Sequence, residues 1–394
     1  MINLAVLFGG RSVEHEVSVI SAIQAIQNMD RERFNIIPVY ITKQNDMYTG
    51  DHLTDIAEYK DIPALIKKSQ KVVFINTGEI VELVAFPPKK FGKNLTIPID
   101  VAFPIVHGTN VEDGTLQGFL KHLGLPVCGC DVMSSAIGMD KYIQKTVLKY
   151  NRIPVLDCLM FTLSDYKDVE KMADTIEAHF KYPVIVKAAN LGSSVGISVA
   201  GDRNALLRSI DDSFTYAKKV IVEHAISNLR EINCSVLGDE NEAEASEIEE
   251  PFHSKEILSY KDKYQSNAKG GSKGMAGVSR QIPADVPAEL RDRIRELAVK
   301  SFKVLGCRGV ARIDFMIDVD TNELYFNEIN TIPGSLAFYL WEPLGVHYKE
   351  LLNRIVDLAL KAKREESAIT FSFDTNLLST TSFGGAKGSK GAKS

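Results

Sequence analysis

The chain has 394 residues, of which 45% are hydrophobic and 25% charged, and its formal net charge is −5. This length predicts two or three packed domains, and the small negative charge gives no electrostatic reason to expect a nucleic acid or an anionic membrane as partner. No apolar run approaches the roughly 20 residues that a membrane span requires, and the five cysteines lack the regular spacing of a disulfide framework, which suits a protein of the reducing cytoplasm.

The first part of the chain alternates apolar strands with helical patterns. Strands are predicted over residues 3–10, 35–42 and 101–108, and a helix over 18–29 separates the first two. The N-terminal MINLAVLFGG has no basic region and runs into a glycine turn, so we expect a first strand there rather than a signal peptide. Strand–helix alternation predicts an α/β unit with a largely parallel sheet, which we assign to residues 1–129.

A second unit is predicted over residues 130–222. It opens with a helix at 140–151, and the stretch 182–200 reads strand, glycine–serine loop and strand. After a further helix the unit ends at the strand 219–225. This order predicts a compact α+β unit that is distinct from the first.

A third unit is predicted over residues 223–376. It contains a strand at 229–238, a helix at 287–305 and a hairpin at 312–330. The basic, low-complexity residues 377–394 are expected to form a disordered tail.

A lysine- and glycine-rich loop, SYKDKYQSNAKGGSKGMAG, interrupts this third unit at residues 259–277. Its composition predicts a mobile, solvated loop. Long loops inside compact domains are often lids over active sites, so a lid is the functional interpretation of the same segment.

The loop between the second unit's strands has the composition of a phosphate cradle. Lys187 ends an apolar strand, and Ser193 and Ser194 stand between glycines six and seven residues later. Backbone N–H groups in such a turn can hold phosphate oxygens, although a plain β-turn explains the same letters. Its spacing is not that of a Walker A motif, and the separate glycine turn in LFGGRSVEHEVS lacks the spacing of a dinucleotide-binding turn. His107 follows a strand of the first unit, at the sheet edge where open α/β sheets bind ligands.

The predicted hairpin poses an electrostatic problem. If it folds about Thr321, then Asp314 lies opposite Glu328 and Arg312 lies opposite Asn330, all on one face. Carboxylates directly opposite each other on a sheet repel. Either the face is solvated and the repulsion is screened, or a divalent cation lies between the carboxylates, since this all-oxygen set suits magnesium bound together with phosphates.

Seven motifs in the same order resemble those of the ATP-grasp carboxylate–amine ligases, and specifically the D-alanine–D-alanine ligase family, over residues 1 to about 360. They are LFGGRSVEHEVS, VHGTNVEDGTLQG, GMDK, VIVKAANLGSSVGIS, YKDKY, RGVARIDF and NEINTIPG. The resemblance implies a three-domain ATP-grasp fold, with ATP held between the second and third units. It also implies a cytoplasmic ATP-dependent ligase, commonly a homodimer, that joins two D-alanines through an acyl phosphate for peptidoglycan synthesis.

The resemblance also implies a role for each matching residue. It implies two magnesium ions, or manganese in their place, on Asp314, Glu328 and Asn330. It implies ATP contacts by Lys141, Lys187, Ser193, Ser194, Glu223, Glu231 and Lys263. It implies that Glu14 receives the ammonium of the first D-alanine beside His107, that Ser193 and Tyr264 organise this site, and that Arg312 and the N–H of Gly334 stabilise the tetrahedral intermediate.

The chain departs from this family after NTIPG. The family usually has a serine there that contacts the carboxylate of the second substrate, whereas this chain has Tyr339 at about that place and Ser335 nearby. The second substrate is therefore open between D-alanine, D-serine, D-lactate and another amino acid. The retained Lys263 and Tyr264 favour an amine acceptor over lactate. A non-catalytic nucleotide-binding regulator is the alternative from another class, and the intact Arg312 argues against it.

Overall fold

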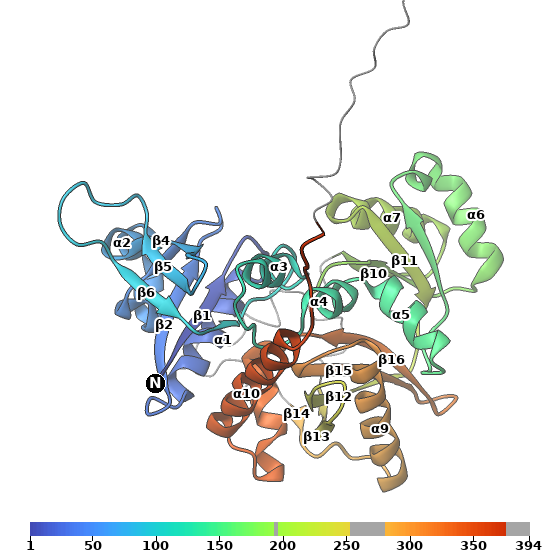
Figure 1. Cartoon of the computed structure of the whole chain (residues 1–394). Coiled ribbons are helices and arrows are strands. Elements are labelled where there is room, and N and C mark those ends of the chain that lie inside the picture. The colour runs from blue at the N-terminus through green and yellow to red at the C-terminus, as the bar shows by residue number, and fades with distance from the viewer. Residues whose placement is uncertain (193–195, 253–279, 376–394) are drawn as a thin grey trace, which may run out of the picture.

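The computed structural model describes residues 1–192, 196–252 and 280–375. Three sheets, of seven, four and five strands, build the molecule. In Figure 1 the seven-stranded sheet lies on the left, the four-stranded sheet at the upper right and the five-stranded sheet below it. The expected lid at 259–277 and the expected tail at 377–394 lie outside the described residues.

The seven-stranded sheet confirms the α/β class and contains the predicted parallel strands. Its strand order is β6-β5-β4-β3-β2-β1-β7, and β1 is parallel to both β2 and β7. The four pairs from β2 to β6 are antiparallel, so the sheet is mixed rather than largely parallel. Its strands are β1 (Ile2–Gly9), β2 (Phe34–Ile41), β3 (Met47–Thr49), β4 (Gln70–Asn76), β5 (Val81–Ala85), β6 (Thr96–Ile99) and β7 (Val101–Pro104).

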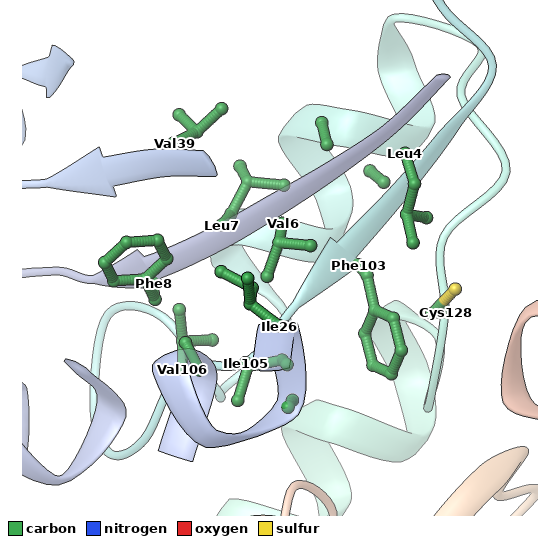
Figure 2. Packing of buried hydrophobic residues seen from close by; sticks show 14 of the residues in the cluster. Leu4, Val6, Leu7, Phe8, Ile26, Val39, Phe103, Ile105, Val106 and Cys128 are labelled. Carbon is green, nitrogen blue, oxygen red and sulfur yellow. The ribbon is translucent and has the colours of Figure 1, made fainter. Parts of the chain in front are cut away.

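The core of this part lies on both faces of β1, where Leu4 to Phe8 are fully buried. Figure 2 shows Val6 and Ile26 between the strand and the first helix, with Leu7 on the side of Val39. The helices of this part are α1 (His15–Asn28), α2 (Ile62–Lys68), α3 (Thr115–His122) and the 3₁₀ turns η1 (Asp51–Thr54) and η2 (Ile56–Lys60).

The four-stranded sheet has the order β10-β9-β11-β8, and all of its pairs are antiparallel. Its strands are β8 (Cys158–Thr162), β9 (Val184–Ala188), β10 (Ile197–Ala200) and β11 (Lys219–His224). Helices α6 (Val169–His179) and α7 (Arg203–Tyr216), with the 3₁₀ turn η3 (Asp165–Asp168), pack against it. Lys187 and Ile197 are opposite each other at the end of the β9–β10 pair, so the glycine–serine loop connects these two strands as predicted.

The five-stranded sheet has the order β14-β13-β12-β15-β16. Its strands are β12 (Leu229–Gly238), β13 (Ala243–Pro251), β14 (Arg280–Gln281), β15 (Gly309–Asp318) and β16 (Glu323–Asn330). The associated helices are α4 (Val132–Met139), α5 (Lys141–Tyr150), α9 (Ala288–Val304), η5 (Gly334–Leu340), η6 (Glu342–Leu344) and α10 (Tyr348–Ser367).

Two helices pack across the boundaries predicted from the sequence. Leu148 of α5 belongs to the core of the five-stranded sheet rather than to that of the four-stranded sheet. Leu351 and Ile355 of α10 belong to the core of the seven-stranded sheet, which Figure 1 shows beside α10. The boundaries at residues 129 and 222 therefore stay a prediction. Among the described residues, none of the helices is long and apolar enough to cross a membrane.

Candidate active site

One face of the five-stranded sheet carries a row of polar side chains. Glu249, Asn233, Asp314 and Glu328 are successive cross-strand partners on β13, β12, β15 and β16. Directly opposite residues project from the same face of a sheet, so the two carboxylates of the predicted hairpin do face each other. Arg312 pairs with Asn330 beside them, as predicted.

The register holds at these residues and changes toward the turn. Asp314 is opposite Glu328, but Phe315 is opposite Phe326, so Asn327 is an extra residue in a β-bulge. The bulge lets Phe326 and Ile329 both reach the core, and it directs Asn327 toward the four-stranded sheet, where its Oδ1 lies 3.3 Å from Nζ of Lys187. Bulges often re-aim side chains next to active sites.

Asp314 is neutralised within its own strand. Arg312 donates Nε and Nη2 to the two carboxylate oxygens of Asp314, both at 2.7 Å, and Asn330 donates to Oδ2 at 3.0 Å. Burial raises the pKa of Asp314, Arg312 opposes that rise, and Glu328 and Glu231 add to it. Three carboxylates, Asp314, Glu328 and Glu231, thus act on one another beside the single guanidinium of Arg312, and a metal cation would relieve this repulsion.

Glu328 is paired with Lys141, which comes from the start of α5. Lys141 Nζ lies 2.9 Å from Oε2 of Glu328 and donates to the carbonyl of Leu191 at 2.9 Å. Asp140 caps the helix by accepting two backbone N–H bonds, an arrangement that fixes where α5 begins. The lysine therefore joins the hairpin to the loop that follows β9.

A fully buried carboxylate lies between two lysines on the four-stranded sheet. Glu223 of β11 contacts Nζ of Lys187 at 2.8 Å and Nζ of Lys145 at 2.6 Å. Burial opposes ionisation of Glu223, and the two lysines lower its pKa below the usual value. Lys187 and Glu223 were predicted to contact ATP, but Lys145 was missed. The one sign of its role in the sequence is its position on the apolar side of the helix 141–150.

Glu14, which is expected to bind the first substrate, lies where loops of the first two units meet. Glu14 is at the N-cap of α1 and is 8% exposed. A Cβ added to Gly108, after β7, would lie 2.8 Å from Oε2 of Glu14, and one added to Gly192, after β9, would lie 3.1 Å away. Loops from two sheets therefore converge on this carboxylate, and a side chain at either glycine would crowd it.

His107 lies in the same region, fully buried, with Nε2 3.2 Å from Oγ of Ser21. Burial lowers the pKa of His107 to about 4, and the charge of Arg312 adds to this effect. A hydrogen bond with the backbone of Ile332 raises the pKa but does not offset the burial. The imidazole is therefore neutral near pH 7.

Glu112 is a buried carboxylate that the sequence analysis did not single out. It accepts hydrogen bonds from the N–H of Gly108 at 2.9 Å, from the N–H of Ile332 at 3.0 Å and from the hydroxyl of Thr331 at 3.2 Å. Burial and the charge of Glu14 raise the pKa of Glu112 to about 8. This side chain ties the loop after β7 to the segment that follows β16.

The segment after β16 turns sharply at the residues where the chain departs from the family pattern. Gly334 begins η5, and Ser335, Leu336 and Ala337 have φ values of 51°, 53° and 50°, a left-handed conformation that costs non-glycine residues energy. The Ser335 hydroxyl bonds to Gln24 of α1 at 2.6 Å. Ser335 therefore packs on α1, whereas Tyr339 reaches the row of polar residues on the sheet.

Tyr339 donates its hydroxyl to Oε1 of Glu249 at 3.0 Å. Both residues act electrostatically on Arg312, so they border the same region as the hairpin carboxylates.

Four of the expected site residues, Ser193, Ser194, Lys263 and Tyr264, lie outside the described residues.

The donor set on the hairpin fits a hard cation. Within residues 1–192, 196–252 and 280–375, no cluster of three or more His, Cys, Asp and Glu side chains forms a metal site, so a site on Asp314 and Glu328 would need the amide oxygen of Asn330. Oxygen-only ligands suit magnesium and exclude the soft metals that prefer thiolates. Lys141 and Arg312 hold these carboxylates now and would give way to the cation.

Comparison with known proteins agrees with this geometry. The family model described as "D-ala D-ala ligase N-terminus" matches residues 3–130, and "D-ala D-ala ligase C-terminus" matches residues 147–357. A relative from Caldicellulosiruptor bescii, named D-alanine--D-alanine ligase, is 40% identical over 378 residues, which cover 94% of this chain and 98% of the relative.

Two solved structures are similar over nearly their whole length. The D-alanine-D-alanine ligase from Coxiella burnetii has a TM-score of 0.78 and 28% identity, covering 93% of this chain and 96% of that one. The VanG D-Ala:D-Ser ligase from Enterococcus faecalis has a TM-score of 0.75 and 31% identity, covering 91% of this chain and 99% of that one. The similarity therefore extends to ligases with different second substrates.

Proposed function

Since the chain belongs to the D-alanine–D-alanine ligase family, we propose that it joins two D-alanine molecules at the expense of ATP and so supplies the dipeptide for peptidoglycan synthesis. The observation that carries this proposal is the junction of the sheets. There Arg312, Asp314, Glu328 and Asn330 lie together on one sheet face, and the charge of Arg312 acts on His107. A protein that only binds nucleotide has no oxyanion to stabilise, so it has no need of Arg312 beside the carboxylates of Asp314 and Glu328.

The nucleotide lies between the four- and five-stranded sheets in this proposal. Lys141 and Lys187 contact its phosphates, and Glu223 and Glu231 border its adenine and ribose. Ser193, Ser194 and Lys263 would complete the phosphate contacts. The placement of Lys141 and Lys187 supports this, because each lysine bridges the β9 region to the β16 strand and would exchange a carboxylate or amide contact for a phosphate.

Asp314, Glu328 and Asn330 would hold two magnesium ions, or manganese in their place. The bound metal would neutralise charge that develops on the transferring phosphoryl group. Release of Asp314 to the metal would free the guanidinium of Arg312 for a second negative oxygen.

The proposed reaction has two steps, and residues of the chain position the reacting groups in each. The carboxylate of the first D-alanine, held through its ammonium by Glu14 beside His107, takes the γ-phosphoryl group and ADP leaves. The amine of the second D-alanine attacks the carbonyl carbon of this acyl phosphate, loses a proton and expels phosphate. Arg312 and the N–H of Gly334 stabilise the oxyanion of that step, while Ser193 and Tyr264 organise the surroundings of Glu14.

A ligase that takes D-serine as acceptor is the second candidate. The altered segment that carries Tyr339, together with the similarity to a D-Ala:D-Ser ligase, favours this alternative over D-lactate. We keep D-alanine as the leading acceptor because the relatives that cover nearly the whole chain carry the name D-alanine--D-alanine ligase.

A cytoplasmic location and a homodimer are further parts of the proposal. Both are properties of the related ligases that the resemblance implies. Light scattering on the purified chain tests the dimer.

A phosphate-release assay tests the function. The purified protein is given Mg-ATP with D-alanine alone, with D-alanine plus D-serine, or with D-alanine plus D-lactate, and the products are identified by mass spectrometry. We expect D-alanyl-D-alanine to be the main product in all three mixtures. ATP binding without any phosphate release or condensed product would instead support the regulator.

A further inference from the structure

A buried histidine contacts the glycine turn that leads from β1 to Glu14. His15 is the first residue of α1 and is 4% exposed. Its Nδ1 lies 2.7 Å from the carbonyl oxygen of Gly10, and its Nε2 lies 3.0 Å from the hydroxyl of Tyr40 on β2. The imidazole therefore connects the turn with the neighbouring strand of the seven-stranded sheet.

These two contacts fix the tautomer of the imidazole. A carbonyl oxygen can only accept a hydrogen bond, so a neutral ring must carry its proton on Nδ1, and Nε2 is left to accept from the hydroxyl of Tyr40. Burial lowers the pKa of His15 below its usual value, although the hydrogen bond with Gly10 raises it. The ring is therefore neutral near pH 7.

The turn that His15 contacts has little room to move. Gly9 and Gly10 have φ values of 92° and 96°, a conformation that glycine adopts without steric cost. A Cβ added to Gly9 would lie 3.1 Å from Cε1 of His15, and one added to Gly10 would lie 2.5 Å from Cγ1 of Val111. The turn is thus packed between the imidazole and the loop after β7.

Hydrogen bonds connect the same turn with Glu14. The carbonyl of Gly10 also accepts the N–H of Ser12 at 3.1 Å, and the hydroxyl of Ser12 accepts the N–H of Glu14 at 3.0 Å. A Cβ added to Gly108 would lie 2.3 Å from that hydroxyl and 2.8 Å from Oε2 of Glu14. A displaced Gly10 carbonyl would therefore move Ser12, and with it Glu14.

We propose that His15 and Tyr40 are positioning residues for the first D-alanine, because the imidazole holds the Gly10 carbonyl and so places Glu14 for the substrate ammonium. This inference rests on the proposed ligase function, to which it adds these two positioning residues. Tyr40 holds the tautomer in this account. A ring protonated on Nε2 instead would present a lone pair to the carbonyl oxygen of Gly10 and repel it.

The alternative is that the two residues only stabilise the seven-stranded sheet, and two substitutions separate these roles. In His15→Asn the amide nitrogen takes the place of Nδ1 and can still donate to Gly10, but the shorter side chain leaves the larger cavity. In His15→Gln the amide extends toward the position of Nε2, so more volume is kept and the donor to Gly10 is lost. A structural role ranks the variants by volume, whereas a positioning role ranks them by the donor.

Initial rates over a wide range of D-alanine concentrations, at saturating Mg-ATP, give one KM for each of the two D-alanines. We expect His15→Gln to raise one of these constants at least about tenfold and to leave the other, and the KM for ATP, within about twofold. The conservative His15→Asn should restore the raised constant to within about threefold of wild type, although it unfolds at the lower temperature of the two variants.

His52→Gln is the matched control. His52 also lies against a glycine, Gly50, and its Nε2 lies 2.8 Å from the hydroxyl of Ser69, but it belongs to η1 and not to the turn before Glu14. We expect this variant to leave all three constants unchanged.

¹⁵N spectra of histidine-labelled protein test the tautomer without any measurement of activity. The signals that disappear in His15→Asn belong to His15. We expect their chemical shifts to show a neutral ring with its proton on Nδ1 in the wild-type protein, and a mixture of the two tautomers in Tyr40→Phe.

Each result decides between the roles. A proton on Nε2 in the wild-type protein would overturn the inference, and so would a rise of all three constants together in His15→Gln. A larger rise in His15→Asn than in His15→Gln would assign a structural role only. If the wild-type protein forms no dipeptide, the proposed function itself fails, whereas the other outcomes leave the ligase function intact.

Discussion

Arg312 and Asp314 form a doubly hydrogen-bonded ion pair two residues apart on β15, with both N–O distances at 2.7 Å. Each residue is needed elsewhere during the proposed reaction, the carboxylate at a metal and the guanidinium at an oxyanion. The ion pair keeps the charges of both groups balanced in a largely buried position. In the proposed mechanism, the pair separates when metal and nucleotide bind.

Asp314→Asn should abolish turnover and also destabilise the metal-free protein. The substitution leaves the guanidinium of Arg312 without its paired charge, and breaking a buried pair in this way is costly. We expect a loss of roughly 2 kcal/mol in the free energy of unfolding, measured by urea denaturation in the presence of a chelator. A metal-free protein that becomes more stable would mean that repulsion from Glu328 outweighs the pair with Arg312.

Glu112→Gln should change how stability depends on pH. The pKa of Glu112 is raised to about 8 in the folded protein from an ordinary value of 4.5, so between these values the folded state holds a proton that the unfolded state has lost. Stability of the wild-type protein then falls as pH rises, by about 1.4 kcal/mol per unit for this group.

The glutamine variant lacks this contribution. Its free energy of unfolding, relative to the wild type, should therefore improve steadily from pH 5 to pH 8 in urea titrations. A difference that is independent of pH would show that Glu112 is ionised in the folded protein throughout that range.

Lys145→Met should weaken ATP binding through Glu223, although Lys145 is not one of the proposed ATP contacts. Its removal leaves Glu223 with Lys187 as its remaining lysine, so Lys187 is held more tightly and is less available to phosphate. We expect a destabilisation of about 3 kcal/mol in thermal unfolding and a raised KM for ATP. Lys149→Met is the control, because Lys149 forms an exposed pair with Asp157. Equal behaviour of the two variants would refute the coupling.

Gly108→Ala should impair use of the first D-alanine. Its φ is +84°, and an added Cβ would lie 2.3 Å from Oγ of Ser12 and 2.8 Å from Oε2 of Glu14. Gly78→Ala is a matched control, since its φ of +93° carries the same backbone strain but its Cβ would meet nothing within 4 Å. We expect both variants to lose about 1 kcal/mol of stability from that strain, and only Gly108→Ala to raise the KM for D-alanine more than about tenfold. If the two variants had similar KM values for D-alanine, Gly108 would not border the site of the first substrate.

The hairpin shows how far the sequence can be interpreted. Strict alternation placed Asp314 opposite Glu328 correctly, because both strands bury one face. The bulge at Asn327 was missed, since it depends on how Phe326 and Ile329 fill the core and not on the turn. The antiparallel strands between Met47 and Ile99 were missed as well, although VVFI in β4 and the alternating VELVA of β5 are typical of strands.

The sequence allowed a role to be expected only for residues that a family motif covers. Glu112 stands inside one of the quoted motifs, yet its role depends on hydrogen bonds to Thr331 and Ile332, far away in sequence. The ion pair of Arg280 with Glu249 is equally non-local. Such contacts arise from the packing of separate units, which no local pattern contains.

The acyl-phosphate mechanism is the central claim, and transfer of an isotope tests it most directly. D-Alanine labelled with ¹⁸O in its carboxylate is incubated with the protein and Mg-ATP, and the released phosphate and dipeptide are analysed by mass spectrometry. The account predicts one ¹⁸O atom in each phosphate and dipeptide in equal amount to phosphate. Unlabelled phosphate, or phosphate released without dipeptide, would contradict it.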